Sequence, residues 1–171
     1  MNLIDVKSPA DLKGLSISEL TDLTAQARQA LMTKVSEHGG HFGPPMGAAE
    51  MIMALHYVFN SPVDKIVYDV SHQSYVHKMV TGRALAFLDH DHYDDVTGYT
   101  DPTESDHDFF NIGHTSTSIS LASGLATARN LKGDSENIIA IIGDGSLSGG
   151  EAFEGLDYAA TLNSNMIIIV N

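Results

Sequence analysis

The stretch Ile138-Ile-Ala-Ile-Ile-Gly-Asp-Gly-Ser146 decides the fold class of this chain. Its first five residues are apolar and mostly β-branched, which is typical of a strand buried on both faces of a parallel sheet. A second such run, Met166-Ile-Ile-Ile-Val170, follows a segment with helical spacing from Gly149 to Leu162. The order strand, helix, strand predicts an α/β domain, with a parallel sheet flanked by helices and right-handed crossovers.

The alternation of helices and strands extends toward the N-terminus. A long helix is expected from about Ser16 to His38, because Ser16 and Glu19 have capping-box spacing and apolar residues recur on one helical face. The residues from Asp89 to Asp108 are rich in Asp, His and Thr, and we interpret them as an exposed loop. The other expected elements are helices at about Gly47–Phe59, Gln73–Thr81 and Thr115–Leu131 and a strand at Lys65–Val70.

Composition narrows the class of protein. At 171 residues, with 43% hydrophobic and 18% charged residues, the chain suits one globular domain. No apolar run approaches the roughly 20 residues that span a bilayer. The absence of cysteine excludes disulfides and thiolate catalysis and fits a cytoplasmic protein.

The net charge of -13 argues against nucleic-acid and anionic-membrane partners. A phosphate ligand would have to be held by backbone N–H groups, helix N-termini and a metal ion.

The sequence Gly143-Asp-Gly145 stands where a parallel strand ends, and open α/β sheets bind ligands at that edge. The glycines allow close approach of a phosphate to the backbone, and Asp144 offers one oxygen ligand for Mg²⁺. The alternative is a turn in which Asp144 only caps the next helix.

Three further motifs contain a histidine near a turn. Gly113-His-Thr-Ser-Thr-Ser118 opens a predicted helix, so its hydroxyls and backbone N–H groups suit an anionic or heteroaromatic ligand. Asp69-Val-Ser-His-Gln73 follows a predicted strand, and Gly39-Gly-His41 lies in a loop. Taken singly, each histidine is more often structural or solvated than functional. The pair His90-Asp-His92 is compatible with a metal site, but its loop composition favours a surface position.

Together these motifs resemble the N-terminal part of the 1-deoxy-D-xylulose-5-phosphate synthases, thiamine-diphosphate enzymes of the transketolase type. The resemblance covers Leu12 to Asn171, in order and with the spacing of the family. It rests on Gly39–Gly43, Ala54–Asp64, Asp69–Lys78, Thr81–Arg83, Glu104–Ser105, Gly113–Ser120 and Gly143–Gly155.

The resemblance implies roles for particular residues. Asp144 matches the magnesium ligand of the family, and Gly145 and Ser146 match the turn that contacts the diphosphate. His41 matches a loop histidine near the substrate, which is expected to assist proton transfer or to bind phosphate. The cofactor contacts are matched by His72, Gly113, His114 and Thr115, and His72 is also a candidate catalytic residue.

The implied reaction condenses pyruvate with glyceraldehyde 3-phosphate, with loss of CO₂, in a homodimer that depends on thiamine diphosphate and Mg²⁺. Residues 1–171 would form the N-terminal portion of the diphosphate-binding domain. Because the sequence stops at Asn171, directly after a predicted strand, we expect a piece of a longer protein, with the second magnesium ligand two residues further on.

The sequence departs from the family at Tyr68, at Asp94-Asp95, where a glycine pair is usual, and at Pro102, where arginine is usual. The departures around residues 89–108 leave the acceptor substrate open. Two alternatives therefore remain: a transketolase-like subunit that uses other sugar phosphates, and a non-catalytic paralogue.

Overall fold

The computed structural model describes residues 1–171, which form two compact units. One unit, called here the helical unit, comprises residues 1–60 and 72–98. The other, called the sheet unit, comprises residues 61–71 and 99–171.

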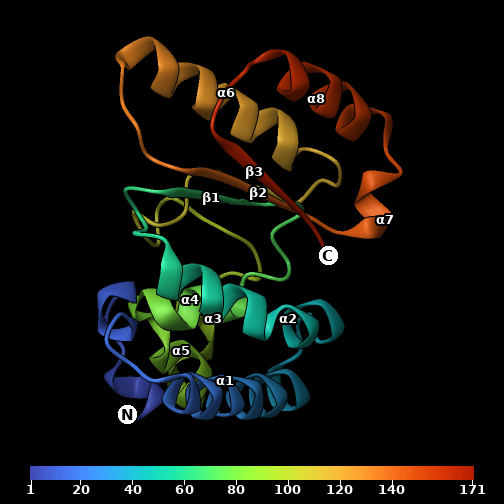
Figure 1. Ribbon diagram of the computed structural model, residues 1–171. Coiled ribbons are helices and arrows are strands. Elements are labelled where there is room, and N and C mark those ends of the chain that lie inside the picture. The colour runs from blue at the N-terminus through green and yellow to red at the C-terminus, as the bar shows by residue number, and fades with distance from the viewer. The chain divides into compact units, whose positions relative to one another are not determined.

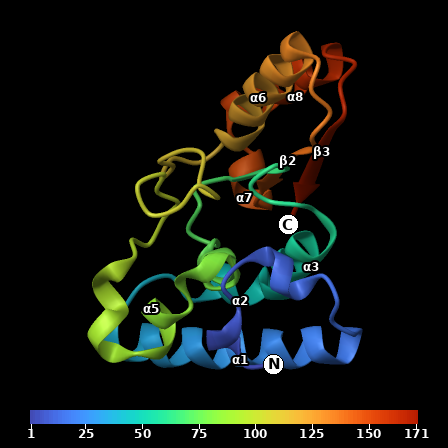
Figure 2. The same cartoon turned by 90° about the vertical axis from the view of Figure 1, so that its left-hand side faces the viewer.

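The sheet unit is built on three parallel strands in the order β1-β2-β3. Ala140 in the central strand pairs with Val67 on one side and with Ile168 on the other. In Figure 1, α6 and α8 run together over one face of this sheet, and the turned view in Figure 2 shows the same pairing. The elements are β1 (Lys65–Tyr68), α6 (Ser118–Lys132), β2 (Ile138–Ile142), α7 (Asp144–Leu147), α8 (Gly150–Thr161) and β3 (Met166–Val170).

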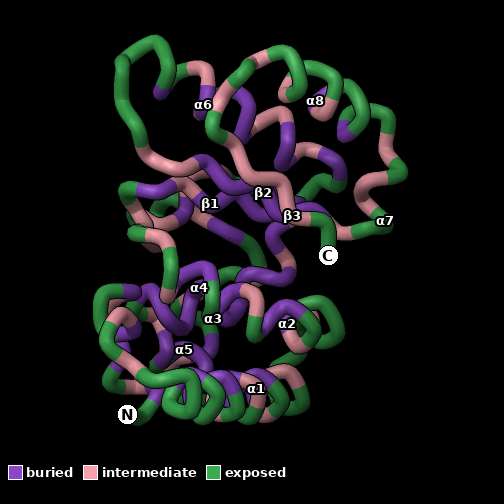
Figure 3. Tube along the Cα trace, viewed as in Figure 1, coloured by how far each residue is buried: buried purple, intermediate pink, exposed green.

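The core of the sheet unit lies between the sheet and α6. All five residues of β2 are buried, as the tube in Figure 3 shows for this strand. Small residues on α6 let the helix approach the sheet closely. The buried cluster consists of Val67, Ile112, Ile119, Ala122, Ala126, Ile138, Ala140, Ile142 and Ala152.

The predicted α/β class with a parallel sheet is confirmed, and β2, α8 and β3 lie within one residue of their expected bounds. Several other elements, β1 and α6 among them, are shorter than expected. β1 ends at Tyr68 because Val70 and Ser71 have positive φ angles of 57° and 71°. α6 begins at Ser118 and not at Thr115, because Ser116 has a φ of 73°.

The helical unit packs several short helices against one long helix. Its elements are η1 (Leu3–Asp5), η2 (Pro9–Leu12), α1 (Ile17–His38), α2 (Gly43–Gly47), α3 (Ala49–Val58), α4 (Tyr75–Lys78), η3 (Met79–Arg83), α5 (Leu85–Leu88) and η4 (His90–Asp95).

The long helix α1 confirms the prediction for the N-terminal region. Ser16 is its N-cap and accepts the Glu19 N–H, while the Glu19 carboxylate accepts the Ser16 N–H, as in a capping box. Gly39 ends the helix with a φ of 90°, a conformation that glycine adopts without strain. The capping residues therefore set both ends of α1.

The prediction of an exposed loop from Asp89 to Asp108 is partly wrong. Residues 90–95 form the 3₁₀ helix η4, and Tyr93 within it is buried in the helical unit. In the sheet unit, Thr100 and Asp108 are buried as well. A short segment with few aliphatic residues has no periodic apolar pattern, so the sequence does not indicate which of its positions are buried.

A buried lysine ties α1 to η4 inside the helical unit. The Lys34 side chain is 6% exposed, and its Nζ donates to the carbonyl oxygens of Ala86 at 2.8 Å and Tyr93 at 2.7 Å. The ammonium also lies 4.4 Å from the centroid of the Phe87 ring, within cation–π range. Lys34 on α1 thus donates to one carbonyl group of α5 and one of η4.

We expect Lys34→Met to lower the free energy of unfolding by about 2 kcal/mol, because two carbonyl groups lose their donor. Denaturant titration of the intact protein would measure the loss. Gln29→Met, at an exposed position on the same helix, is the matched control and should stay within about 0.5 kcal/mol of wild type. Equal stability of both variants would contradict the structural role of Lys34.

None of the helices combines the length and the apolar character that a membrane span requires.

Candidate functional site

The turn after β2 presents Asp144 at the carboxyl edge of the sheet. Asp144 is exposed, and its N–H donates to the carbonyl oxygen of Asn171 at 3.0 Å, so the turn is anchored to the end of the neighbouring strand. The Asp144 Oδ1 accepts the Gly145 N–H at 2.7 Å, which orients the carboxylate. The second oxygen, Oδ2, has no hydrogen-bond partner within the protein. An oriented carboxylate with one open oxygen fits a ligand for Mg²⁺.

The segment from Gly113 to Ser116 is joined to this turn. The Ser116 hydroxyl donates to the carbonyl oxygen of Ser146 at 2.7 Å. A side chain at Gly149 would collide with Ser116, so glycine at this position permits the close approach. The structure therefore brings together two of the predicted cofactor segments, Gly113–Thr115 and Asp144–Ser146.

Three predicted contacts in this region, Gly113, His114 and Thr115, are exposed. The His114 Nδ1 lies 2.7 Å from the carbonyl oxygen of Thr115. Because a carbonyl oxygen only accepts, Nδ1 carries a proton and Nε2 is the acceptor of the neutral ring. A cavity of about 310 Å³ borders Gly113 and His114, with Glu151 on its lining, so a ligand can reach these residues.

The residue that organises this segment is Asp69, to which the sequence alone assigned no role. Its carboxylate is 1% exposed and accepts two backbone N–H groups, from Ser116 at Oδ1 and from Ser118 at Oδ2, both at 2.9 Å. Thr117, the N-cap of α6, makes no side-chain capping bond. The sequence signal that could have identified Asp69 is its position, because it is an acidic residue directly after a predicted buried strand.

In the helical unit, His41 and His72 lie side by side. Their ring centroids are 5.4 Å apart with an interplanar angle of 74°, and both residues are half-buried. They come from segments more than 30 positions apart in the sequence. The two predicted catalytic histidines are therefore neighbours in this unit.

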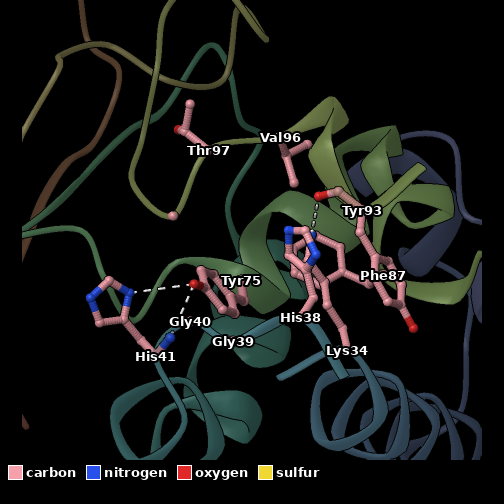
Figure 4. Close-up of a pocket in the computed structure, with 11 residues that line it drawn as sticks. Lys34, His38, Gly39, Gly40, His41, Tyr75, Phe87, Tyr93, Val96 and Thr97 are labelled. Carbon is pink, nitrogen blue, oxygen red and sulfur yellow. Dashed lines mark hydrogen bonds between the residues drawn. The ribbon is translucent and has the colours of Figure 1, made fainter. Parts of the chain in front are cut away.

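A pocket of about 210 Å³ opens beside His41 in the helical unit, as the close-up in Figure 4 shows. The Lys34 ammonium contributes positive charge to its wall. The imidazole of His38, also on the wall, lies 3.0 Å from the Asp94 carboxylate. Asp94 is one of the two residues that depart from the family's glycine pair, so this departure places an acid next to the pocket.

The histidines of the His90-Asp-His92 sequence lie on the surface of the helical unit. His92 Nδ1 lies 2.7 Å from the Asp95 carboxylate, and this hydrogen bond raises the pKa of His92. His90 is exposed and lies 3.7 Å from the Asp91 carboxylate. Elsewhere, too, no group of three or more His, Cys, Asp or Glu side chains is arranged to hold a metal. A magnesium ion at Asp144 would therefore take its other ligands from waters, phosphate oxygens or further residues.

The profile of a protein family described as 1-deoxy-D-xylulose-5-phosphate synthase matches residues 3–171. The 1-deoxy-D-xylulose-5-phosphate synthase of Caldanaerobacter subterraneus subsp. tengcongensis is 50% identical over 169 residues, which are 99% of this chain and 27% of that protein. The protein of the same name from Chlorobaculum tepidum is 48% identical over the same shares of the two chains. The 1-deoxy-D-xylulose-5-phosphate synthase 2 of Geobacter sulfurreducens is 49% identical over 97% of this chain and 26% of its own.

These matches confirm the resemblance that the motifs indicated. The chain spans about a quarter of the length of the curated relatives that it matches.

Proposed function

Because the chain belongs to the 1-deoxy-D-xylulose-5-phosphate synthase family, we propose that it forms the diphosphate-binding part of an enzyme with that activity. The reaction is the condensation of pyruvate with glyceraldehyde 3-phosphate, with loss of CO₂, to give 1-deoxy-D-xylulose 5-phosphate. The observation that carries the proposal is the hydrogen bond between Ser116 and Ser146, which joins the two segments of the sheet unit that match the cofactor contacts.

Asp144 is the proposed protein ligand for Mg²⁺. Its carboxylate is exposed and oriented by the Gly145 N–H. No Lys or Arg follows Lys132 in the sequence, and the net charge of the chain is -13. A metal ion is therefore the means by which this acidic protein would hold a diphosphate group, with Gly145 and Ser146 approaching the phosphate oxygens.

Thiamine diphosphate, when bound, supplies the carbanion chemistry of the reaction. The residues of this chain would bind and orient it and would manage protons around it. Gly113, His114 and Thr115 offer backbone groups and an imidazole at the edge of the sheet unit. His72 would contact the cofactor, and His41 would donate a hydrogen bond or a proton to a substrate oxygen.

The remaining features of the proposal rest on the family. We expect a homodimer in the cytoplasm, acting on small-molecule substrates that serve isoprenoid and thiamine synthesis. An absence of cysteine fits that location. Asp94 stands where the family usually has glycine and lies 3.0 Å from His38 on the pocket wall, and this departure is the observation behind a second candidate, a transketolase-like enzyme with another acceptor or donor.

The test is to identify the product. The intact protein, with Mg²⁺ and thiamine diphosphate, would be incubated with pyruvate and glyceraldehyde 3-phosphate, and mass spectrometry would detect 1-deoxy-D-xylulose 5-phosphate together with released CO₂. Parallel incubations would replace pyruvate by a ketose phosphate donor. Product from the ketose phosphate alone would favour the transketolase-like enzyme, and cofactor binding without any turnover would favour a non-catalytic paralogue.

A further inference from the structure

The hydroxyl of Tyr75 is hydrogen-bonded to the loop that carries His41. Tyr75 is 4% exposed and opens helix α4, and its ring packs against Phe87 with centroids 5.4 Å apart. Figure 4 shows the phenol reaching from α4 to the loop, where two hydrogen bonds end on its oxygen. The ring is therefore held by the core of the helical unit, while its hydroxyl faces the candidate catalytic loop.

Both hydrogen bonds of this hydroxyl go to the same residue. The backbone N–H of His41 donates to Tyr75 Oη at 3.2 Å, and His41 Nδ1 lies 3.3 Å from the same oxygen. Both distances lie at the long end of the range for hydrogen bonds. One of them restrains the backbone of His41 and the other restrains its ring, so a single hydroxyl contacts both parts of the residue.

The direction of the second hydrogen bond depends on the imidazole tautomer. A phenol has one proton to donate, and its oxygen can accept from more than one donor. Tyr75 Oη accepts the His41 N–H, whereas either atom can be the donor between Oη and His41 Nδ1. The tautomer with the proton on Nε2 gives the phenolic proton an acceptor within the protein, so the arrangement favours Nδ1 as the acceptor.

Two glycines make room for this arrangement. Gly40 has a φ of 121°, and a Cβ at that position would lie 2.8 Å from Tyr75 Oη. A Cβ at Gly98 would lie 3.4 Å from the same oxygen and 3.6 Å from the His41 ring. Backbone thus closes around the hydroxyl from two sides, which limits the positions that the His41 ring can take.

We propose that Tyr75 is a positioning residue that holds His41 in the tautomer with Nε2 protonated, so that His41 acts toward substrate as a hydrogen-bond donor. This inference rests on the proposed function for the role of His41. It narrows that role, because a neutral imidazole with Nδ1 engaged by Tyr75 presents an N–H, and not a lone pair, from its other nitrogen. A substrate oxygen, in a carbonyl or phosphate group, is the partner that such a donor fits.

The decisive variant is Tyr75→Phe, which keeps the ring against Phe87 and removes only the hydroxyl. We expect kcat for product formation to fall about tenfold, the order of one lost hydrogen bond, while KM for pyruvate changes less than about twofold. In a His41→Ala background the same substitution should have no further effect, since residues that act as a unit are not additive.

Two readouts are independent of turnover. In the intact protein without substrates, hydrogen exchange of the His41 amide should be at least about tenfold faster in Tyr75→Phe than in wild type. Nitrogen NMR of protein labelled in its histidines, with the His41 signal assigned by its loss in His41→Gln, should show Nε2 protonated in the neutral wild-type ring.

The matched control is Tyr158→Phe. Tyr158 is exposed on α8, and its hydroxyl lies 3.3 Å from the Thr127 hydroxyl and not near a histidine. In this variant, kcat and the exchange of the His41 amide should stay within about twofold of wild type.

A wild-type His41 ring protonated on Nδ1 would overturn the proposal, even if Tyr75→Phe failed to fold. The proposal would also be overturned if Tyr75→Phe lowered kcat by the same factor in the wild-type and in the His41→Ala background. Should the intact protein make no 1-deoxy-D-xylulose 5-phosphate, the proposed function would fail, while the exchange and NMR results would still decide whether Tyr75 positions His41.

Discussion

Asp144→Ala is expected to abolish magnesium-dependent binding of thiamine diphosphate, with a loss of affinity of at least about a hundredfold, or about 3 kcal/mol. The reason lies in the charge of the site. The turn after β2 offers backbone groups and one carboxylate, and the chain as a whole carries a charge of -13. Without the carboxylate, the metal loses its anionic protein ligand from this turn, and the diphosphate loses the cation that attracts it.

Calorimetric titration of the intact protein with thiamine diphosphate, with and without Mg²⁺, would measure this loss. Asp134→Ala is the matched control, because Asp134 is an exposed acid in the loop before β2 and so lies toward the opposite end of the strand. It should bind like wild type. Wild-type affinity in Asp144→Ala would refute the metal assignment, and a wild-type protein that binds no thiamine diphosphate would favour the non-catalytic paralogue.

Asp69→Asn is expected to lower the free energy of unfolding by about 2–3 kcal/mol. The Asp69 carboxylate is buried and accepts the N–H groups of Ser116 and Ser118, one on each oxygen. Asparagine offers only one oxygen, so its NH₂ group would face one of these N–H donors. The substitution also removes a negative charge at the N-terminus of α6, where the helix dipole favours an anion.

Denaturant titration would measure the stability, and hydrogen exchange at Ser116 and Ser118 would localise the change. Asp157→Asn, at an exposed position of α8, removes the same charge without buried bonds and should stay within about 0.5 kcal/mol of wild type. Because the Ser116 turn carries Gly113–Thr115, we also expect weaker cofactor binding in Asp69→Asn. Unchanged stability and exchange would show that Asp69 does not organise this turn.

The sequence was most informative where the physical signal is local. β2 and β3 were predicted from uninterrupted apolar runs, which are typical of a strand buried on both faces. β2 is buried along its whole length, whereas β3, on one side of the three-stranded sheet, is only half-buried and ends in the exposed Val170. The start of α1 was predicted from the capping-box spacing of Ser16 and Glu19, since capping depends on residues close in the chain. The motifs also indicated the family, which the comparisons confirmed.

The loop between residues 89 and 108 was predicted less well. Tyr93, Thr100 and Asp108 are buried there, but each is a single position without a periodic pattern. Likewise, α6 starts later than predicted because Ser116 has a left-handed conformation. Serine rarely adopts that conformation, so the sequence does not predict it.

By itself, then, the sequence determined the α/β class, most of the elements and the residues that match a thiamine-diphosphate site. Tertiary structure alone decided which side chains support those residues. Asp69 binds N–H groups 47 and 49 positions away, and Tyr75 binds His41 34 positions away. Such contacts leave no local pattern in the chain, because they exist only once the backbone has folded and has placed a buried acceptor or hydroxyl against a distant loop.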